Sequence, residues 1–308
     1  MKFWMYLGAL VASSLWVSAE QAWVALSKVD GINAYKGQVA LFGVKEELEA
    51  LRLESHLHGS NADSFVISEA RKEENGLLFL EIEFKPTLRR GTFSAELMVG
   101  QGAGSQLVQL RGVATKALEG KNEPPLQELL DALGAGVDAG GEKLVLDTKA
   151  NQIGDAMAVT QFEPVQGAAV KLTPLARYSP PGETPFGLAI VEGEEIELRT
   201  VGTLAATGDA RPDAHQTLHP PLANGLAVVT VPEPAPRFGL FLKAHKYTSL
   251  TFPGRSEGAT IKHTTRIYPV KQLQGNAVAD AYLVCFEEAS NGDYQDAVFL
   301  IEGVKAVK

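Results

Sequence analysis

Apolar residues recur at every second position in several short stretches of this chain. The segment LLFLEIEF, residues 77–84, places four apolar side chains on one face and two glutamates on the other, and the same period recurs in residues 93–99 and 108–110. An extended strand has a period of two, whereas an amphipathic helix has a period of 3.6. Turn-forming segments rich in Gly, Pro and Asn separate these stretches. The first part of the chain is therefore predicted to form a β-sandwich of half-buried strands.

The second half of the chain, residues 143–308, is a succession of short apolar runs. Gly, Pro and Asn separate these runs, and the whole chain contains 30 Gly and 16 Pro. Runs of this length with frequent turns are typical of a β-sandwich rather than of a helical domain. We predict a second, larger, jelly-roll-like β-sandwich here.

Residues 115–142 interrupt the β pattern. Within them, NEPPLQELLDALG carries four leucines at helical spacing, preceded by two prolines and followed by a glycine: Leu126, Leu129, Leu130 and Leu133, with Pro124, Pro125 and Gly134. Proline is favoured at the start of a helix and glycine just after its end. This segment is predicted to be a linker with one short helix.

The first sandwich resembles a known type of domain. The strings DSFVIS, IEFKPTLRRGTFSAELMV and VQLRGVA are similar to the immunoglobulin-like repeats of the abnormal-spindle and hydin type, at Phe65, Ile67, Phe84, Pro86, Gly91, Phe93, Ala95, Leu97, Leu110 and Gly112. The resemblance implies an immunoglobulin-like spacer over residues 20–114 without an active site. The whole chain is thus predicted to be all-β, with two β-sandwich domains joined by a short helical linker.

The first 19 residues predict the destination of the protein. They combine Lys2, the apolar stretch FWMYLGALVASSLWV and the residues Val17, Ser18 and Ala19 at the positions that a signal peptidase reads. This is the pattern of a signal peptide, so we expect a secreted protein, periplasmic or extracellular, at the cell envelope. The net charge of −9 disfavours nucleic acid and anionic membranes, and no later apolar run is long enough to predict membrane insertion.

The most unusual segment is CFEEASNGDYQDAVFLI, residues 285–301. Two apolar runs flank a polar loop that turns at Asn291-Gly292, which predicts a hairpin. The loop gathers five potential cation ligands: Glu287, Glu288, Asn291, Asp293 and Asp296. Carboxylates this close repel one another, and solvent exposure, proton uptake or a hard cation such as Ca²⁺ relieves the repulsion. The loop is therefore either a calcium site or a solvated acidic turn.

This segment also resembles an uncharacterised family of secreted bacterial β-sandwich domains. The family signature reads Phe-Glu-Asp, a Gly-rich loop, then Gly-Asp-x-Asp-Phe-Asn-Asp and an apolar strand. Here Phe286-Glu287-Glu288 and Gly292-Asp293-Tyr294-Gln295-Asp296 match it, with Glu288 in place of Asp and Gln295 in place of Asn. By this resemblance, Ca²⁺ would be held by Glu288, Asp293 and Asp296.

A hydrolase is the alternative from another class. Residues 254–258, GRSEG, match the Gly-x-Ser-x-Gly nucleophile elbow around Ser256. That motif needs a following helix and a later histidine, but the next residues are strand-like and His263 is the only later histidine. Glu287 and Asp293 are the other candidates, as paired carboxylates. Cys285 lies in an apolar run and is predicted to be a buried strand residue rather than a nucleophile.

The sequence favours a binding protein without catalytic activity. No Gly-rich phosphate loop opens a helix, and basic residues are dispersed among acids, so nucleotides and nucleic acid are not expected. Arg177 and Arg266 each lie close to a tyrosine in the sequence. Such pairs occur in carbohydrate-binding sites, but they also occur where strand edges pack together. We predict binding or adhesion, with a saccharide or a cell-surface protein as partner. A purely structural envelope protein is the remaining alternative.

Overall fold

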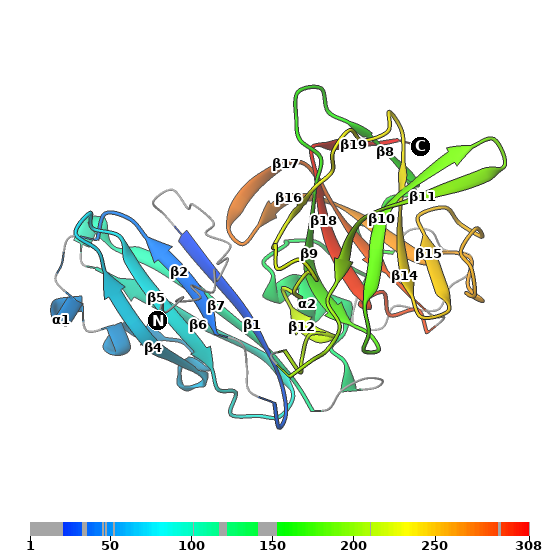
Figure 1. Cartoon of the computed structure of the whole chain (residues 1–308). Coiled ribbons are helices and arrows are strands. Elements are labelled where there is room, and N and C mark those ends of the chain that lie inside the picture. Colours follow the sequence, from blue (N-terminus) through cyan, green and yellow to red (C-terminus); the bar gives the residue numbers. More distant parts are fainter. Residues whose placement is uncertain are drawn as a thin grey trace, which may run out of the picture.

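The chain folds into two β-sandwiches that lie side by side (Figure 1). The computed structural model describes residues 21–32, 36–44, 46, 48–51, 53–100, 102–116, 122–140, 153–209, 211–288 and 291–307. The predicted signal peptide lies outside these residues. The all-β prediction with two sandwiches is confirmed. Within the described part of the chain, no helix is both long and apolar enough to cross a membrane.

The first sandwich consists of two sheets and a few short helical turns. One sheet has the order β1 (Gln21–Val29), β7 (Gln106–Thr115), β6 (Gly91–Val99) and β3 (Leu57–His58), and the other has the order β2 (Gly37–Leu41), β5 (Leu78–Phe84) and β4 (Phe65–Lys72). The helical turns are α1 (Leu48–Leu51) and the 3₁₀ segments Leu53–His56, Ala62–Ser64 and Gly102–Gly104. β1 runs parallel to β7, and the other strand pairs are antiparallel.

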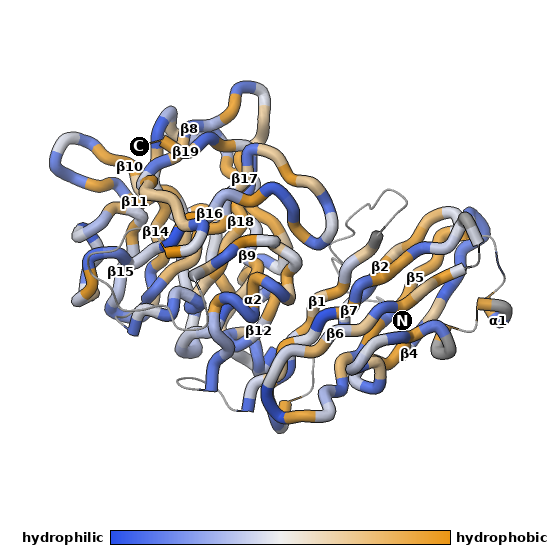
Figure 2. The backbone as a smooth tube through the Cα atoms, turned by 180° about the vertical axis from the view of Figure 1, so that it is seen from behind, coloured by the Kyte–Doolittle hydropathy of each residue, from blue (hydrophilic) through white to orange (hydrophobic). Residues whose placement is uncertain are grey.

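The predicted alternation of apolar and polar residues identifies the side chains that form the core of this sandwich. Buried and partly exposed residues alternate along the whole of β5, and Figure 2 shows hydrophobic and hydrophilic residues side by side along the strands of this sandwich. Phe84 lies at the centre, stacked on Phe65 and edge-on to Phe93, each with ring centroids 5.3 Å apart. Gly112 faces the Phe84 ring so closely that a Cβ atom there would collide with it. The core therefore needs glycine at this position.

The second sandwich is larger. One sheet has the order β11 (Glu195–Leu204), β10 (Thr184–Glu192), β14 (Gly239–Ala244) and β15 (Tyr247–Leu250). A six-stranded sheet faces it, with the order β12 (Gln216–Leu218), β9 (Lys171–Tyr178), β18 (Ala297–Glu302), β17 (Asn276–Phe286) and β16 (Thr265–Leu273), and with β13 (Val229–Thr230) paired to β9. β8 (Gln161–Pro164) and β19 (Val304–Val307) form a separate pair.

The six-stranded sheet is buried on both faces. One face packs against the four-stranded sheet through side chains such as Phe186, Phe286 and Phe299. The other face carries side chains that include Leu175, Cys285 and Val298. They pack against residues 126–139, the segment that precedes this domain in the chain. A strand that is covered on both faces has no need of polar residues. This explains the uninterrupted apolar sequence of β18, whose first five residues are all buried.

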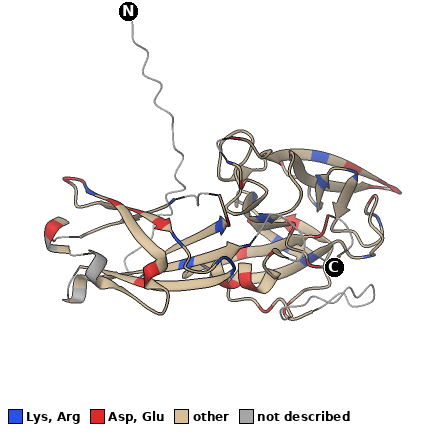
Figure 3. Cartoon of the chain, turned by 90° about the horizontal axis from the view of Figure 1, so that it is seen from below, with Lys and Arg blue, Asp and Glu red and all other residues tan. Residues whose placement is uncertain are grey.

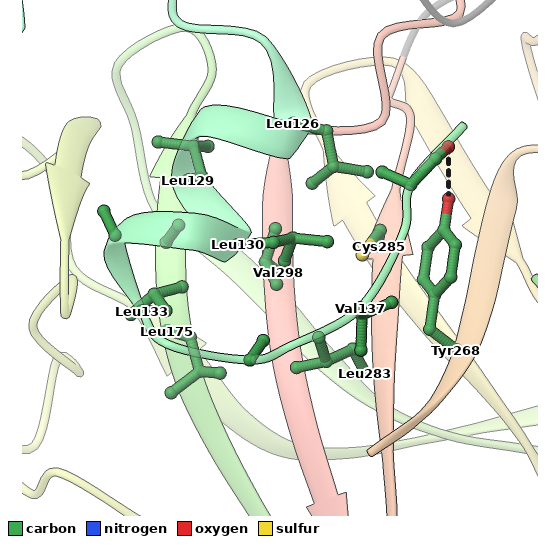
Figure 4. Close-up of a cluster of buried hydrophobic side chains, with 14 of the residues drawn as sticks. Leu126, Leu129, Leu130, Leu133, Val137, Leu175, Tyr268, Leu283, Cys285 and Val298 are labelled. Carbon is green, nitrogen blue, oxygen red and sulfur yellow. Dashed lines mark hydrogen bonds between the residues drawn. The ribbon is translucent and has the colours of Figure 1, made fainter. Parts of the chain in front are cut away.

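Helix α2 (Leu126–Ala132) covers the second face of this sheet (Figure 4). The predicted leucines, Leu126, Leu129, Leu130 and Leu133, are all buried. The chain then continues across the sheet to Ala139, whose carbonyl oxygen accepts a 3.4 Å hydrogen bond from the Tyr268 hydroxyl. The helix was predicted from the leucine spacing, and the structure adds that it is part of the hydrophobic core of the second sandwich.

Side chains of β1 connect the two sandwiches. The Trp23 indole Nε1 donates to the carbonyl oxygen of Ala132 in α2 at 2.9 Å. The Ser27 hydroxyl lies 2.8 Å from the Thr217 hydroxyl of β12 and accepts from the Leu218 backbone N–H at 2.9 Å. These contacts are buried or partly buried, so they order the junction between the domains.

Candidate metal centre

The predicted hairpin at the C-terminal end of the chain is present. β17 and β18 pair antiparallel from Ala281 with Glu302 to Phe286 with Ala297, and residues 287–296 form the loop. Residues 289 and 290 lie outside the described part. The loop is packed into the protein, because Glu287 is 0% exposed and Asp296 is 6% exposed. The alternative of a solvated acidic turn is therefore wrong for these two carboxylates.

Glu287 organises the loop. Its Oε2 atom accepts hydrogen bonds from the backbone N–H groups of Gly292 at 2.7 Å and Asp293 at 3.1 Å, and Oε1 accepts from Asn291 at 3.4 Å. A carboxylate that accepts several backbone N–H groups fixes the path of a turn. This arrangement curls the chain around the Glu287 side chain.

Two further carboxylates converge on Glu287. One carboxylate oxygen each from Glu287, Asp293 and Asp296 lies within 4.8 Å of the others. Asp296 Oδ2 accepts from the Glu288 backbone N–H at 2.6 Å, and Asp293 Oδ2 accepts from the side-chain amides of Asn291 at 2.7 Å and Gln295 at 3.2 Å. Asp293 Oδ1 is a buried atom without a hydrogen-bond donor in the described part of the chain. This group of carboxylates could hold a cation, because a buried oxygen without a close donor has lost the hydrogen bonds that water would provide.

The structure changes the predicted set of ligands. The five candidates from the sequence included both glutamates, and the family resemblance implied Glu288, Asp293 and Asp296 as ligands, whereas the group that converges is Glu287, Asp293 and Asp296. Both glutamates follow the end of β17 at Phe286, and Glu288 donates its backbone N–H to Asp296 while its carboxylate lies outside the converging group. Asn291 is exposed, and its amide oxygen accepts the Asp293 backbone N–H at 3.2 Å.

Burial and mutual repulsion change the protonation of this cluster. Burial raises the pKa of Asp293 to about 7, and the nearby negative charges of Glu287 and Glu123 add to the shift. The pKa of Asp296 is raised well above its usual range by burial and then by Glu287, Asp293 and Glu288. A carboxylic acid that cannot be hydrated takes up a proton or a counter-ion. Near neutral pH, this cluster therefore favours an added positive charge.

Two buried arginines from distant strands lie against the acidic loop. Arg177 of β9 is 1% exposed and donates to the hydroxyls of Ser179 and Thr184 and to the carbonyls of Pro180, Gly182 and Ala205. Burial lowers the pKa of Arg177 to about 10, opposed by the charges of Glu288 and Asp296, so it stays protonated at neutral pH. Arg266 of β16 lies over the Tyr294 ring, 4.8 Å from its centroid. Neither is exposed enough to form an open carbohydrate site.

The charges in this region balance only when the carboxylates take up protons or a cation. If all four carboxylates, from Glu287, Glu288, Asp293 and Asp296, are ionised, they exceed the two arginines by two negative charges, and the raised pKa values of Asp293 and Asp296 reflect this excess. An unbalanced buried charge is costly, and one divalent cation would restore neutrality.

Glu123, which precedes α2, adds a further carboxylate at the edge of the loop. Its oxygens accept hydrogen bonds from the side-chain amides of Gln216 at 2.8 Å and Gln295 at 3.3 Å. No sequence pattern places Glu123 here, because it lies 172 residues before Gln295, in the part predicted to be a linker. It connects that segment to the acidic loop.

The other predicted catalytic candidates occupy different surroundings. Ser256 Oγ lies 2.6 Å from the Thr264 hydroxyl and accepts the Leu250 backbone N–H at 3.0 Å. The next regular element is strand β16, so the helix that a nucleophile elbow requires does not follow Ser256. His263 lines a small cavity of about 70 Å³ whose lining includes neither Ser256 nor the acidic loop. Cys285 is buried as predicted, and burial raises its pKa.

Comparison with known proteins gives no relative for this chain. No protein-family model matches it, and neither a curated protein nor a solved structure is similar to it at a significant level. The resemblances to immunoglobulin-like repeats and to the secreted bacterial family thus stay predictions, and the function rests on the site itself.

Proposed function

We propose that this protein is a secreted, non-catalytic binding or adhesion protein whose C-terminal loop binds one Ca²⁺ ion. The observation that carries the proposal is the convergence of carboxylate oxygens from Glu287, Asp293 and Asp296 within 4.8 Å of one another. The raised pKa values of Asp293 and Asp296 and the negative charge of the region support it. The ion would order a loop whose own charges repel one another.

The donor set favours calcium over other metals. All three converging groups are carboxylates, and zinc sites in proteins are built mainly from cysteine and histidine. Calcium takes six to eight oxygens in flexible geometry, so backbone carbonyls and water would complete the shell. Extracellular modules bind Ca²⁺ with dissociation constants of about 10⁻⁴ to 10⁻³ M. An affinity in this range is sufficient for an exported protein, as the signal peptide predicts, because calcium is plentiful outside the cell.

The partner would be a saccharide or a cell-surface protein. Two sandwiches with ordered loops provide a rigid scaffold, and binding residues are often located on such loops. Acidic and basic residues are interspersed over both sandwiches (Figure 3), and the described residues show no basic stripe that would favour nucleic acid. This part of the proposal rests on the fold and the predicted export.

Thermal unfolding in calcium and in chelator tests the proposal. A ligand present at ten times its dissociation constant stabilises the folded state by about 1.4 kcal/mol. We expect calcium to raise the melting temperature of the full chain by roughly 3 to 6 °C. Asp296→Asn keeps an oxygen that can accept the Glu288 N–H, but it removes the charge, so the rise should disappear.

The matched control is Asp209→Asn, the same change at an exposed turn of the second sandwich. This variant should respond to calcium as the wild type does. An equal melting temperature of the wild type in calcium and in chelator would remove the support for the metal site. Magnesium at the same concentration separates a specific site from general screening of charge.

A further inference from the structure

Strand β11 leaves part of its outer edge open. It lies at the end of its sheet and pairs only with β10 among the described strands. Residues 221–223 cover its C-terminal end, through hydrogen bonds from Ala205 N–H to Pro221 and from Ala223 N–H to Thr203. The edge from Glu195 to Gly202 has no strand beside it in the described residues. Figure 1 shows the β10–β11 hairpin projecting from the body of the domain.

Two other edge strands of the second sandwich, β15 and β12, are contacted by neighbouring segments. β15 exchanges two backbone hydrogen bonds between Thr248 and Glu257 from the following loop. β12 contacts β1 of the first sandwich through Thr217 and Ser27. An open edge is a template for another strand, and proteins usually cover it or blunt it with lysine or proline. β11 contains neither residue, although it carries charges at Glu195, Glu197 and Arg199 and one extra residue, Val201, in its pairing with β10.

The same hairpin exposes apolar side chains. Leu198 is 41% exposed and Val191 is 40% exposed, and both lie on the face of the sheet that carries Ala189 and Phe241. Register places Ile196 opposite Val191 and Leu198 opposite Ala189, so these side chains form one surface beside the open edge. An exposed apolar surface beside an unpaired edge is typical of an interface.

The charges of β11 match a second copy of the same strand. Glu197 and Arg199 flank Leu198, are exposed, and lie on the same face with their side chains 3.7 Å apart. If two copies pair antiparallel with Leu198 opposite Leu198, each Glu197 faces the Arg199 of the other copy. If the twofold axis lay at residue 197 or 199 instead, the two copies of Glu197 or the two copies of Arg199 would face each other. The sequence of the edge therefore selects one symmetric register.

We propose that β11 is a homodimer interface in which two chains join their four-stranded sheets across a twofold axis at Leu198. The pairing completes the backbone hydrogen bonds of both edges and covers Leu198, and the two Glu197–Arg199 pairs fix the register. A second copy is the occupant, because the charge pattern complements itself. This proposal is independent of the calcium site.

Charge reversal of the full chain tests the interface. In Glu197→Arg, two arginines of one chain face two arginines of the other, and in Arg199→Glu, glutamates face glutamates. Each variant alone should lose the dimer. In an equimolar mixture, the arginines of one variant face the glutamates of the other, so the dimer should return. Light scattering after size-exclusion chromatography, over a series of protein concentrations, measures the mass.

The expected result is a wild type that reaches twice the mass of one chain, two variants at the mass of one chain, and a mixture that dimerises again. Recovery in the mixture also shows that both variants are folded. A wild type that keeps the mass of one chain at every concentration would overturn the proposal. Dimers of either single variant, or a mixture of monomers, would equally exclude this interface.

Discussion

In the presence of chelator, the stability of this protein is expected to fall as the pH rises from about 4 to about 8. The cause is the acidic loop, where burial and repulsion raise the pKa of Asp293 to about 7 and that of Asp296 well above its usual range. An unfolded aspartate has a pKa of about 3.9. Between these values the folded protein binds more protons than the unfolded chain, so stability decreases with pH.

The expected loss is about 4 kcal/mol from Asp293 alone, because each pH unit between its folded and unfolded pKa values corresponds to about 1.4 kcal/mol, and Asp296 adds to this loss. The stabilising effect of the bound protons is fully present below the pKa of the unfolded chain. It is lost as the pH rises through the pKa of the folded state. Saturating Ca²⁺ should remove most of this slope, since the ion replaces the protons.

Urea unfolding at a series of pH values, with chelator and with calcium, measures the slope. The double variant Asp293→Asn/Asp296→Asn removes both raised carboxyl groups and should show a smaller loss between acid and neutral pH. At neutral pH in chelator, this variant should be more stable than the wild type. A wild type whose stability is flat or rises over this interval would contradict the electrostatic account of the loop.

Leu130→Ala in α2 is expected to cost about 2 to 5 kcal/mol of stability. Leu130 is fully buried, and it packs in one cluster with Cys285 and Val298 of the six-stranded sheet (Figure 4). Alanine has a high helix propensity, so the cost comes from the cavity rather than from the helix itself. A helix that served only as a linker would tolerate the change.

Denaturant unfolding of Leu130→Ala and of Asp131→Ala compares a buried and an exposed position of the same helix. The control should change stability by no more than about 0.5 kcal/mol. If Leu130→Ala is also within that range, α2 does not contribute to the core of the second sandwich.

Strand patterns predict the first sandwich well because its strands have one face inside and one face partly exposed. The alternation in residues 78–84 therefore marks both the strand and its buried face. In the second sandwich, β18 is buried on both faces, so its apolar sequence predicts a strand but not what covers each side. The leucine spacing likewise predicts α2 without indicating that its apolar face packs on the sheet behind Cys285.

The acidic loop could be predicted from its composition, but its geometry could not. Glu287 and Glu288 are equivalent in sequence, and only the direction of the backbone places Glu287 among the converging carboxylates. Arg177 and Arg266 come from strands far away along the chain. An arginine within an apolar strand is a signal of a buried ion pair, because a charge inside a protein needs a counter-charge. Glu123 carries no such signal.

Calorimetric titration of the metal-free protein with Ca²⁺ tests the central claim most directly. Near neutral pH, we expect about one ion per chain with a dissociation constant of about 10⁻⁴ to 10⁻³ M. Binding should release protons, because Asp293 and Asp296 hold them in the metal-free state, and two buffers with different ionisation heats reveal this release. Asp296→Asn should not bind. Absence of binding to the wild type, or equal binding to Asp296→Asn, would contradict the account.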